Sequence, residues 1–196
     1  MKISLIGMSG SGKSYWSKQL VKSGFKRICC DDLIEEKLSK DLKKLGFSGI
    51  ADVSRWMGQP YESRSLHASK QYLELENLVI DEICSKLDRE KKVVIDTTGS
   101  VIYINALTLK KLTTLTKTIY LQVPSSAKKE MYDLYMKDLK PVIWGTSFNR
   151  KSGESGPGAL KRCYPDLLEY RSNIYEKLAH ITTVSYTHLR AHETKA

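Results

Sequence analysis

The stretch GMSGSGKS, residues 7–14, decides the fold that this sequence predicts. It satisfies the pattern G-x-x-x-x-G-K-[ST]; an apolar run (KISLI, 2–6) precedes it, and a helical pattern to about Leu20 follows it. A strand, a glycine-rich loop and a helix in this order form a P-loop, in which backbone N–H groups point at phosphate oxygens. The stretch therefore predicts a nucleoside-triphosphate site.

The residues of this loop have separable roles in holding a nucleotide. Lys13 would reach the β- and γ-phosphates, and the hydroxyl of Ser14 would hold Mg²⁺. The helix behind the loop adds roughly half a positive charge at its N-terminus. We expect the ligands to be ATP and Mg²⁺, with the phosphates contacting Gly7, Ser9, Gly10, Ser11, Gly12, Lys13, Ser14 and Tyr15.

The rest of the chain alternates between strand and helix patterns. Apolar runs predict strands at 25–30, 93–96, 118–123 and 180–184, and helical spacing predicts helices at 32–45, 65–88, 103–115 and 125–139. Strands separated by helices need crossover connections, so the class is α/β with a parallel sheet. Residues 144–158, rich in Gly, Ser and charge, predict a mobile loop.

Composition narrows the class of protein. The 196 residues are 41% hydrophobic, which fits one globular domain, and we expect a monomer. The net charge of +10 favours anionic partners. The basic residues are spread along predicted helices without an RNA-recognition or zinc-finger pattern, so nucleic acid is not the expected partner and a solvated lysine-rich surface explains the excess equally well. No apolar run approaches the ~18 residues of a membrane span, and the start does not resemble a signal peptide, so we expect a cytoplasmic protein.

Several motifs, taken in order, resemble the shikimate kinase family over about residues 1–184. They are the P-loop, DDLIE (31–35), VVIDTTG (93–99), KPVI (140–143) and YRSNIYEKLA (170–179). The resemblance implies one domain with a five-stranded parallel sheet flanked by helices, a substrate-binding segment and a lid at about 140–162. It implies transfer of the γ-phosphoryl group of ATP to a hydroxyl of a small anionic metabolite, shikimate or a related acceptor.

The resemblance also assigns residues on the acceptor side. Asp31 matches the substrate-binding aspartate. It would accept a hydrogen bond from the attacking hydroxyl, and it is the candidate base that takes the proton of this hydroxyl. Arg171 would reach the anionic group of the substrate, and Lys140 of the lid would contact the phosphates. Gly99 is the surviving member of a triple glycine that reads Thr98-Gly99-Ser100 here.

Two departures from the family indicate an altered acceptor site. Cys29 stands where the family has a second aspartate, and Leu73 stands where it has an arginine for the substrate carboxylate. Losing one of two such arginines removes charge-assisted hydrogen bonds worth roughly 1.5–3 kcal/mol each. The acceptor could therefore differ from shikimate.

Asp96, at the end of VVID, resembles the carboxylate that steadies Mg²⁺ in many P-loop enzymes, although a turn or helix-cap aspartate has the same pattern. The same position also resembles polynucleotide kinase-like enzymes, so a kinase acting on nucleosides or nucleic-acid ends is an alternative. A nucleotide-binding module without catalysis is another. Arg150, Lys151 and Arg162 could fold over the phosphates or be ordinary solvated charges.

The stretch ICCDDLIE (28–35) sets two cysteines beside two aspartates. Strand alternation places Cys29 and Asp31 on one face and Cys30 on the other, which disfavours a metal site or a redox pair. Asp32, with Glu35 three residues later, fits a helix N-cap.

The last expectations from the sequence concern the cysteines and the C-terminal tail. The four cysteines show no CxxC pair and should be reduced and mostly buried. The tail at 185–196 replaces a closing helix that the resemblance calls for; it looks foreign, and we expect it to be poorly ordered. His188 and His192 within it lack a third metal ligand.

Overall fold

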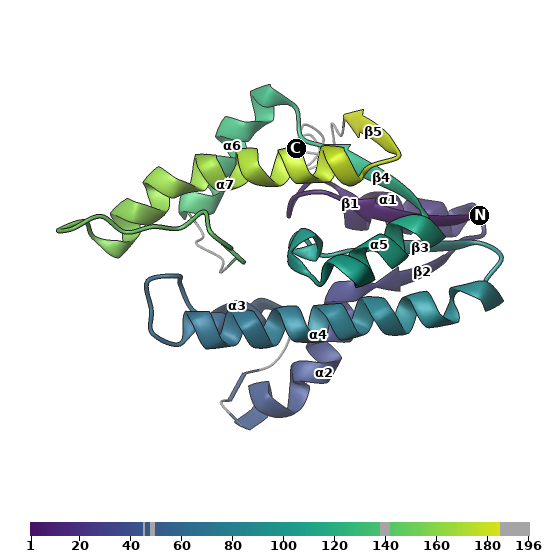
Figure 1. Cartoon of the computed structure of the whole chain (residues 1–196), viewed down its shortest axis with the longest axis horizontal. Helices are drawn as coiled ribbons and strands as arrows, with labels where there is room; N and C mark the ends of the chain where they lie inside the picture. Colours follow the sequence, from purple (N-terminus) through teal and green to yellow (C-terminus); the bar gives the residue numbers. More distant parts are fainter. Residues whose placement is uncertain (45, 48–49, 138–141, 185–196) are drawn as a thin grey trace, which may run out of the picture.

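A computed structural model describes residues 1–44, 46–47, 50–137 and 142–184 (Figure 1). In these residues one parallel sheet has the strand order β2-β3-β1-β4-β5. Its strands are β1 (Lys2–Ile6), β2 (Lys26–Cys29), β3 (Val93–Asp96), β4 (Lys117–Gln122) and β5 (Ile181–Val184). The predicted α/β class and parallel sheet are confirmed, and all five strands lie within a few residues of the expected ranges.

Helices connect and cover the strands. They are α1 (Lys13–Lys22), α2 (Cys30–Lys44), α3 (Ile50–Met57), α4 (Ser65–Lys86), α5 (Ala106–Leu115), α6 (Ser125–Lys137) and α7 (Gly156–Leu178), with short 3-10 helices η1 (Leu87–Arg89) and η2 (Val101–Tyr103). In Figure 1, α4 and α7 run on either side of α5 and the strands. No described helix is both long and apolar enough to cross a membrane.

Alternate strand residues face two separate cores, as a buried parallel sheet requires. Ile3 and Leu5 of β1 pack with Leu20 of α1 in the smaller core. Ile95 of β3 and Tyr120 of β4 face the larger core, which also contains side chains of α2, α4, α6 and α7. Because the strands are parallel, their carboxyl ends meet at one edge, so the segments after β1, β2 and β3 lie together there.

Two local predictions are wrong. The helix after β2 begins at Cys30, so Asp31 and Asp32 lie in its first turn and Asp32 is not its N-cap. Strand alternation therefore does not apply to Asp31. Carboxylates in a first turn are favoured by the helix dipole, which explains a start directly after the strand.

The segment 144–158, predicted as a loop, is helical from Gly156 onward. The hydroxyl of Ser155 accepts a hydrogen bond from the N–H of Gly158 at 3.1 Å and caps α7. Pro157 stands in the first turn, where the missing N–H costs nothing. A Gly-Pro-Gly run that suggests a loop thus serves as a helix start.

All four cysteines are free; Cys30, Cys84 and Cys163 are buried and Cys29 is half-buried. The prediction that they are mostly buried is confirmed. The tail at 185–196, including His188 and His192, lies outside the described residues. All four residues of β5 before it are exposed.

Candidate active site

The P-loop takes its shape from three glycines with positive φ. These are Gly7 at 146°, Gly10 at 80° and Gly12 at 90°. A Cβ on Gly7 would come within 2.8 Å of Ser11 Oγ and 2.9 Å of the carbonyl oxygen of Leu121. Side chains are excluded there, so the backbone can turn tightly from β1 into α1. Gly12 is the N-cap of α1 and no side chain caps this end, which leaves its first N–H groups for an anion.

Lys13 lies folded into the loop that it follows. Its side chain is buried, and Nζ donates hydrogen bonds to the carbonyl oxygens of Gly7 and Met8, each at 2.8 Å. Burial lowers the pKa of Lys13 to about 8, against the opposing charges of Asp31 and Asp96. A phosphate group placed on the loop would restore the preference for the charged form.

Asp31 lies in the first turn of α2 and interacts electrostatically with Lys13. Burial raises its pKa, and the positive charge of Lys13 opposes this rise. A half-buried carboxylate beside the P-loop lysine is positioned as a hydrogen-bond acceptor for a hydroxyl near the phosphates.

Asp96, at the end of β3, is bound by two groups. Its Oδ2 accepts from Nη2 of Arg27 at 2.6 Å and from the hydroxyl of Ser17 at 3.0 Å. Cys29 is its register partner on β2, so the carboxylate that the family has at position 29 is matched here by one on the adjacent strand. The side chains of Asp96 and the exposed Ser14 offer the oxygen donors that Mg²⁺ prefers.

Gly99 lies next to both the P-loop and Arg171. The hydroxyl of Tyr175 donates to the carbonyl oxygen of Gly99. A Cβ on Gly99 would lie 3.2 Å from the backbone nitrogen of Ser9 and 3.6 Å from Nη1 of Arg171. A side chain at this point would therefore need the P-loop backbone to move by a few tenths of an ångström.

Arg171 of α7 is a buried cation whose charge has no described counter-ion. It is 5% exposed, donates to the carbonyl oxygen of Ile143 and lies 5.4 Å above the ring of Tyr103. Among the described residues no carboxylate forms an ion pair with it, and its Nε has no hydrogen-bond partner. A buried, unpaired guanidinium is expensive, so the side chain is suited to bind an anion.

Aromatic side chains, among them Tyr135 and Tyr164, lie near this arginine, and the sequence analysis did not predict them. Tyr135 and Tyr164 are stacked with ring centroids 4.0 Å apart, and Trp144 meets Tyr135 edge-on at 6.5 Å. The Tyr135 hydroxyl and Trp144 Nε1 are buried without a partner in the described part of the chain. Helical spacing alone marks Tyr135 and Tyr164 as core residues, which hides their place beside the site.

Glu76 of α4 is the other residue that the sequence analysis did not single out. It is fully buried and accepts hydrogen bonds from Ser100 Oγ at 2.6 Å and from Thr98 Oγ1. Burial raises its pKa to about 7, although these two hydrogen bonds lower it. A glutamate within the apolar stripe of a helix, between Tyr72 and Val79, was the available signal.

The lid residues are placed only in part. Lys140 lies outside the described residues, so its role stays a prediction. Arg162 donates to both carboxylate oxygens of Glu154 at 2.9 and 2.8 Å, and Arg150 donates to the backbone oxygen of Glu154 at 2.6 Å. Lys151 contributes its backbone N–H to the same carboxylate at 3.0 Å. In this structure these residues hold the loop before α7 together.

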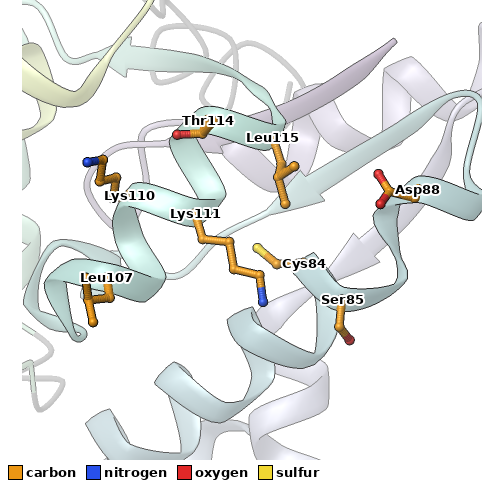
Figure 2. A pocket seen from close by; sticks show the side chains of 8 residues that line it. All are labelled: Cys84, Ser85, Asp88, Leu107, Lys110, Lys111, Thr114 and Leu115. Atoms are coloured by element: carbon orange, nitrogen blue, oxygen red, sulfur yellow. The ribbon is translucent and has the colours of Figure 1, made fainter.

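A hollow elsewhere on the surface does not belong to this site. Figure 2 shows it between the end of α4, with Cys84 and Ser85, and α5, with Lys110 and Lys111. These helix ends lead into the amino ends of β3 and β4, whereas the P-loop follows the carboxyl end of β1. Among the described residues, no group of three His, Cys, Asp or Glu side chains is placed to hold a metal ion.

Solved structures with the same architecture are shikimate kinases. The enzyme of Acinetobacter baumannii, in complex with shikimate, matches with a TM-score of 0.59 at 22% identity over 93% of this chain and 82% of its own. The chain has the shikimate kinase fold. The enzymes of Bacteroides thetaiotaomicron (18% identity, 94% and 86% covered) and Aquifex aeolicus (20%, 95% and 88%) both match with a TM-score of 0.57. No family model matches the sequence, and no curated protein matches it.

The shikimate kinase fold confirms the P-loop kinase architecture that the sequence predicted. Identities of 18–22% support the fold and not the acceptor. The roles of the individual side chains must therefore be argued from their own geometry.

Proposed function

We propose that the protein is an ATP-dependent phosphotransferase that transfers the γ-phosphoryl group to a hydroxyl of a small anionic metabolite, shikimate or a related acceptor. The observation that carries the proposal is the buried cation of Arg171, which forms no ion pair among the described residues and lies, like the P-loop, next to Gly99. A phosphate-binding loop beside a second anion site fits a nucleotide and an anionic acceptor together. We propose that the protein works as a monomer in the cytoplasm.

The proposed reaction assigns one task to each group. The γ-phosphate would rest on the N–H groups of the loop and on Lys13, and Ser14 and Asp96 would hold Mg²⁺, which would supply further charge neutralisation. The acceptor oxygen forms a bond to the γ-phosphorus while the bond to the leaving oxygen of ADP breaks. Asp31 orients the acceptor hydroxyl and takes its proton. Arg171 holds the anionic group of the acceptor, and the aromatic side chains around it exclude water.

The test is an ADP-release assay with a panel of hydroxylated acids, shikimate included. Nucleosides and oligonucleotides with free 5′-hydroxyls serve as competing acceptors. Acceptor-dependent turnover with one hydroxylated acid supports the proposal. Turnover only with nucleosides or nucleic-acid ends would replace it with the nucleoside kinase alternative, and ATP binding without any acceptor-dependent turnover would replace it with a non-catalytic nucleotide-binding module.

Two variants separate catalysis from folding in this assay. Lys13→Ala should reduce turnover at least about a hundredfold, because it removes a charge that stabilises the transferred phosphoryl group. Asp31→Asn should reduce kcat by about 10²–10⁴-fold, since the amide cannot accept the proton. Both variants should keep the circular dichroism spectrum of the unmodified protein. Full turnover in either variant would contradict its assigned role.

A further inference from the structure

Glu76, Thr98 and Ser100 form a closed ring of oxygen atoms beside the acceptor site. Ser100 Oγ lies 2.6 Å from Glu76 Oε2, and the two hydroxyl oxygens lie 2.9 Å apart. Thr98 Oγ1 closes the ring by its contact with Glu76 Oε1. The three side chains are all buried, so water cannot complete their hydrogen bonds.

The number of protons in this ring depends on the state of Glu76. Three oxygen-oxygen contacts must each hold a proton to be hydrogen bonds, but two hydroxyls supply only two protons. If Glu76 were ionised, one contact would bring two oxygens together with no hydrogen between them. A proton on the carboxyl group completes the ring in either direction.

A backbone hydrogen bond to the ring is consistent with the same number of protons. The N–H of Ser100 donates to Thr98 Oγ1 at 3.0 Å. With a protonated Glu76, Thr98 Oγ1 accepts two hydrogen bonds and donates one, which is the full capacity of a hydroxyl. The geometry therefore fits a neutral acid with every ring contact satisfied.

We propose that the ring holds Glu76 as a neutral carboxylic acid, so that no carboxylate in the described part of the chain compensates the buried charge of Arg171, which is left for the anion of the acceptor. Glu76 and Arg171 interact electrostatically, so an ionised Glu76 would supply the negative charge that the acceptor brings. Glu76 is on this basis a positioning residue that sets the charge of the site. The second half of this inference rests on the proposed function, since it assumes an anionic acceptor at Arg171.

Two residues of the ring, and one residue near it, depart from the shikimate kinase pattern. Thr98 and Ser100 replace two members of a triple glycine, which has no hydroxyls, and Leu73 replaces an arginine one turn before Glu76. A glutamate beside an arginine stays ionised, whereas one beside a leucine and two hydroxyls does not. The three substitutions thus change the charge of one carboxyl group together.

Some groups around Glu76 favour its neutral form, and others favour its ionised form. Burial is the largest influence and favours the neutral form, and the negative charge of Asp31 adds to it. The charges of Lys13 and Arg171 favour ionisation. The titratable groups that face Glu76 are Lys13 on α1, Cys30 and Asp31 on α2, Tyr72 on α4, and Arg171 and Tyr175 on α7.

The first experiment detects the proton directly in the free protein. Infrared difference spectra at about one pH unit below and above 7 should show the carbonyl band of one buried carboxylic acid, lost at the higher pH. Glu76→Gln should abolish this band, and Glu74→Gln, at an exposed position two residues earlier on α4, should keep it. Absence of the band in the unmodified protein, or its persistence in Glu76→Gln, would overturn the proposal.

A second measurement does not depend on a variant that folds. In protein labelled with ¹³C at the glutamate carboxyls, one resonance should titrate near 7. If no glutamate resonance titrated near 7, Glu76 would be ionised at neutral pH and the proposal would be wrong. Leu73→Arg should move the titration of the single high resonance downward, because it restores a cation beside the carboxyl group.

Binding of shikimate tests the consequence for Arg171. Shikimate should bind the unmodified protein about fivefold to tenfold more tightly at about pH 6 than at about pH 8. Glu76→Gln should remove this difference. Equal pH dependence in both proteins would overturn the link between Glu76 and Arg171. No binding at either pH would count against shikimate as the acceptor, whereas the infrared band decides the state of Glu76 separately.

Discussion

At the scale of single residues, burial rather than pairing sets the charges of this site. Lys13 and Glu76 are both fully enclosed, and both have pKa values moved toward neutrality, to about 8 and about 7. Arg171 is enclosed as well and remains charged. The free site therefore holds groups whose preferred charge depends on what binds next to them.

The affinity for ATP should fall as the pH rises above about 8. The ammonium group of Lys13 loses its proton there in the free protein, and the neutral amine attracts the phosphates less. The dissociation constant of ATP, measured by calorimetry at about pH 7 and pH 9, should rise about tenfold. Lys13→Met should bind weakly at both pH values; a constant affinity in the unmodified protein would contradict the burial of a titrating lysine.

Leu73→Arg should strengthen the binding of shikimate about tenfold to a hundredfold, because it adds charge-assisted hydrogen bonds to the carboxylate. The change is read from the Michaelis constant for shikimate in the ADP-release assay. Leu78→Arg, at an exposed position of the same helix, is the matched control and should leave it unchanged. An equal gain in both variants would indicate a general effect of positive charge.

Sequence alone could predict some of these residues and not others. The P-loop residues are predictable because eight consecutive positions carry the whole motif and local backbone geometry sets their arrangement. Glu76 was not predictable as a site residue, because its partners Ser100 and Thr98 lie 24 and 22 residues away in the sequence. They meet Glu76 only when α4 packs beside the end of β3. Trp144 likewise joins the site only through tertiary contacts.

At the scale of elements, the parallel sheet was predictable because continuous apolar runs separated by helical periods allow few other arrangements. Helix boundaries were less predictable. The start of α2 was misjudged because Cys30 is an unusual first residue. No helix was predicted for α7, whose first residue Gly156 belongs to a run that also fits a turn. The periodic pattern gave no prediction for α3, which has only eight residues.

The loop before α7 depends on one carboxylate, so Glu154→Ala should make it more sensitive to trypsin. The two hydrogen bonds from Arg162 lower the pKa of Glu154 to about 2, so the side chain is ionised at neutral pH. Its removal leaves Arg162 with only its hydrogen bonds to Asn149 and leaves the backbone N–H of Lys151 without this acceptor. Cleavage after Arg150 or Lys151 should become several times faster by mass spectrometry. Glu169→Ala, an exposed position on α7, should be cleaved at the rate of the unmodified protein.

At the scale of the whole molecule, the acceptor site couples function to stability. A buried carboxyl group that is protonated in the folded protein and ionised in the unfolded chain makes folding take up a proton. Unfolding then becomes easier as the pH rises from about 4.5 to about 7, the interval between the two pKa values of Glu76.

Glu76→Gln should therefore flatten the dependence of stability on pH. In the unmodified protein the contribution of Glu76 to the free energy of unfolding should fall by on the order of 3 kcal/mol between about pH 4.5 and about pH 7.5, because its pKa is raised from 4.5 to about 7. Urea denaturation at several pH values measures this slope. Glu74→Gln should keep the slope of the unmodified protein, since Glu74 is exposed on the same helix. If Glu76→Gln kept it too, the proton taken up on folding would belong to another group, and Asp31, whose pKa burial also raises, would be the next to substitute.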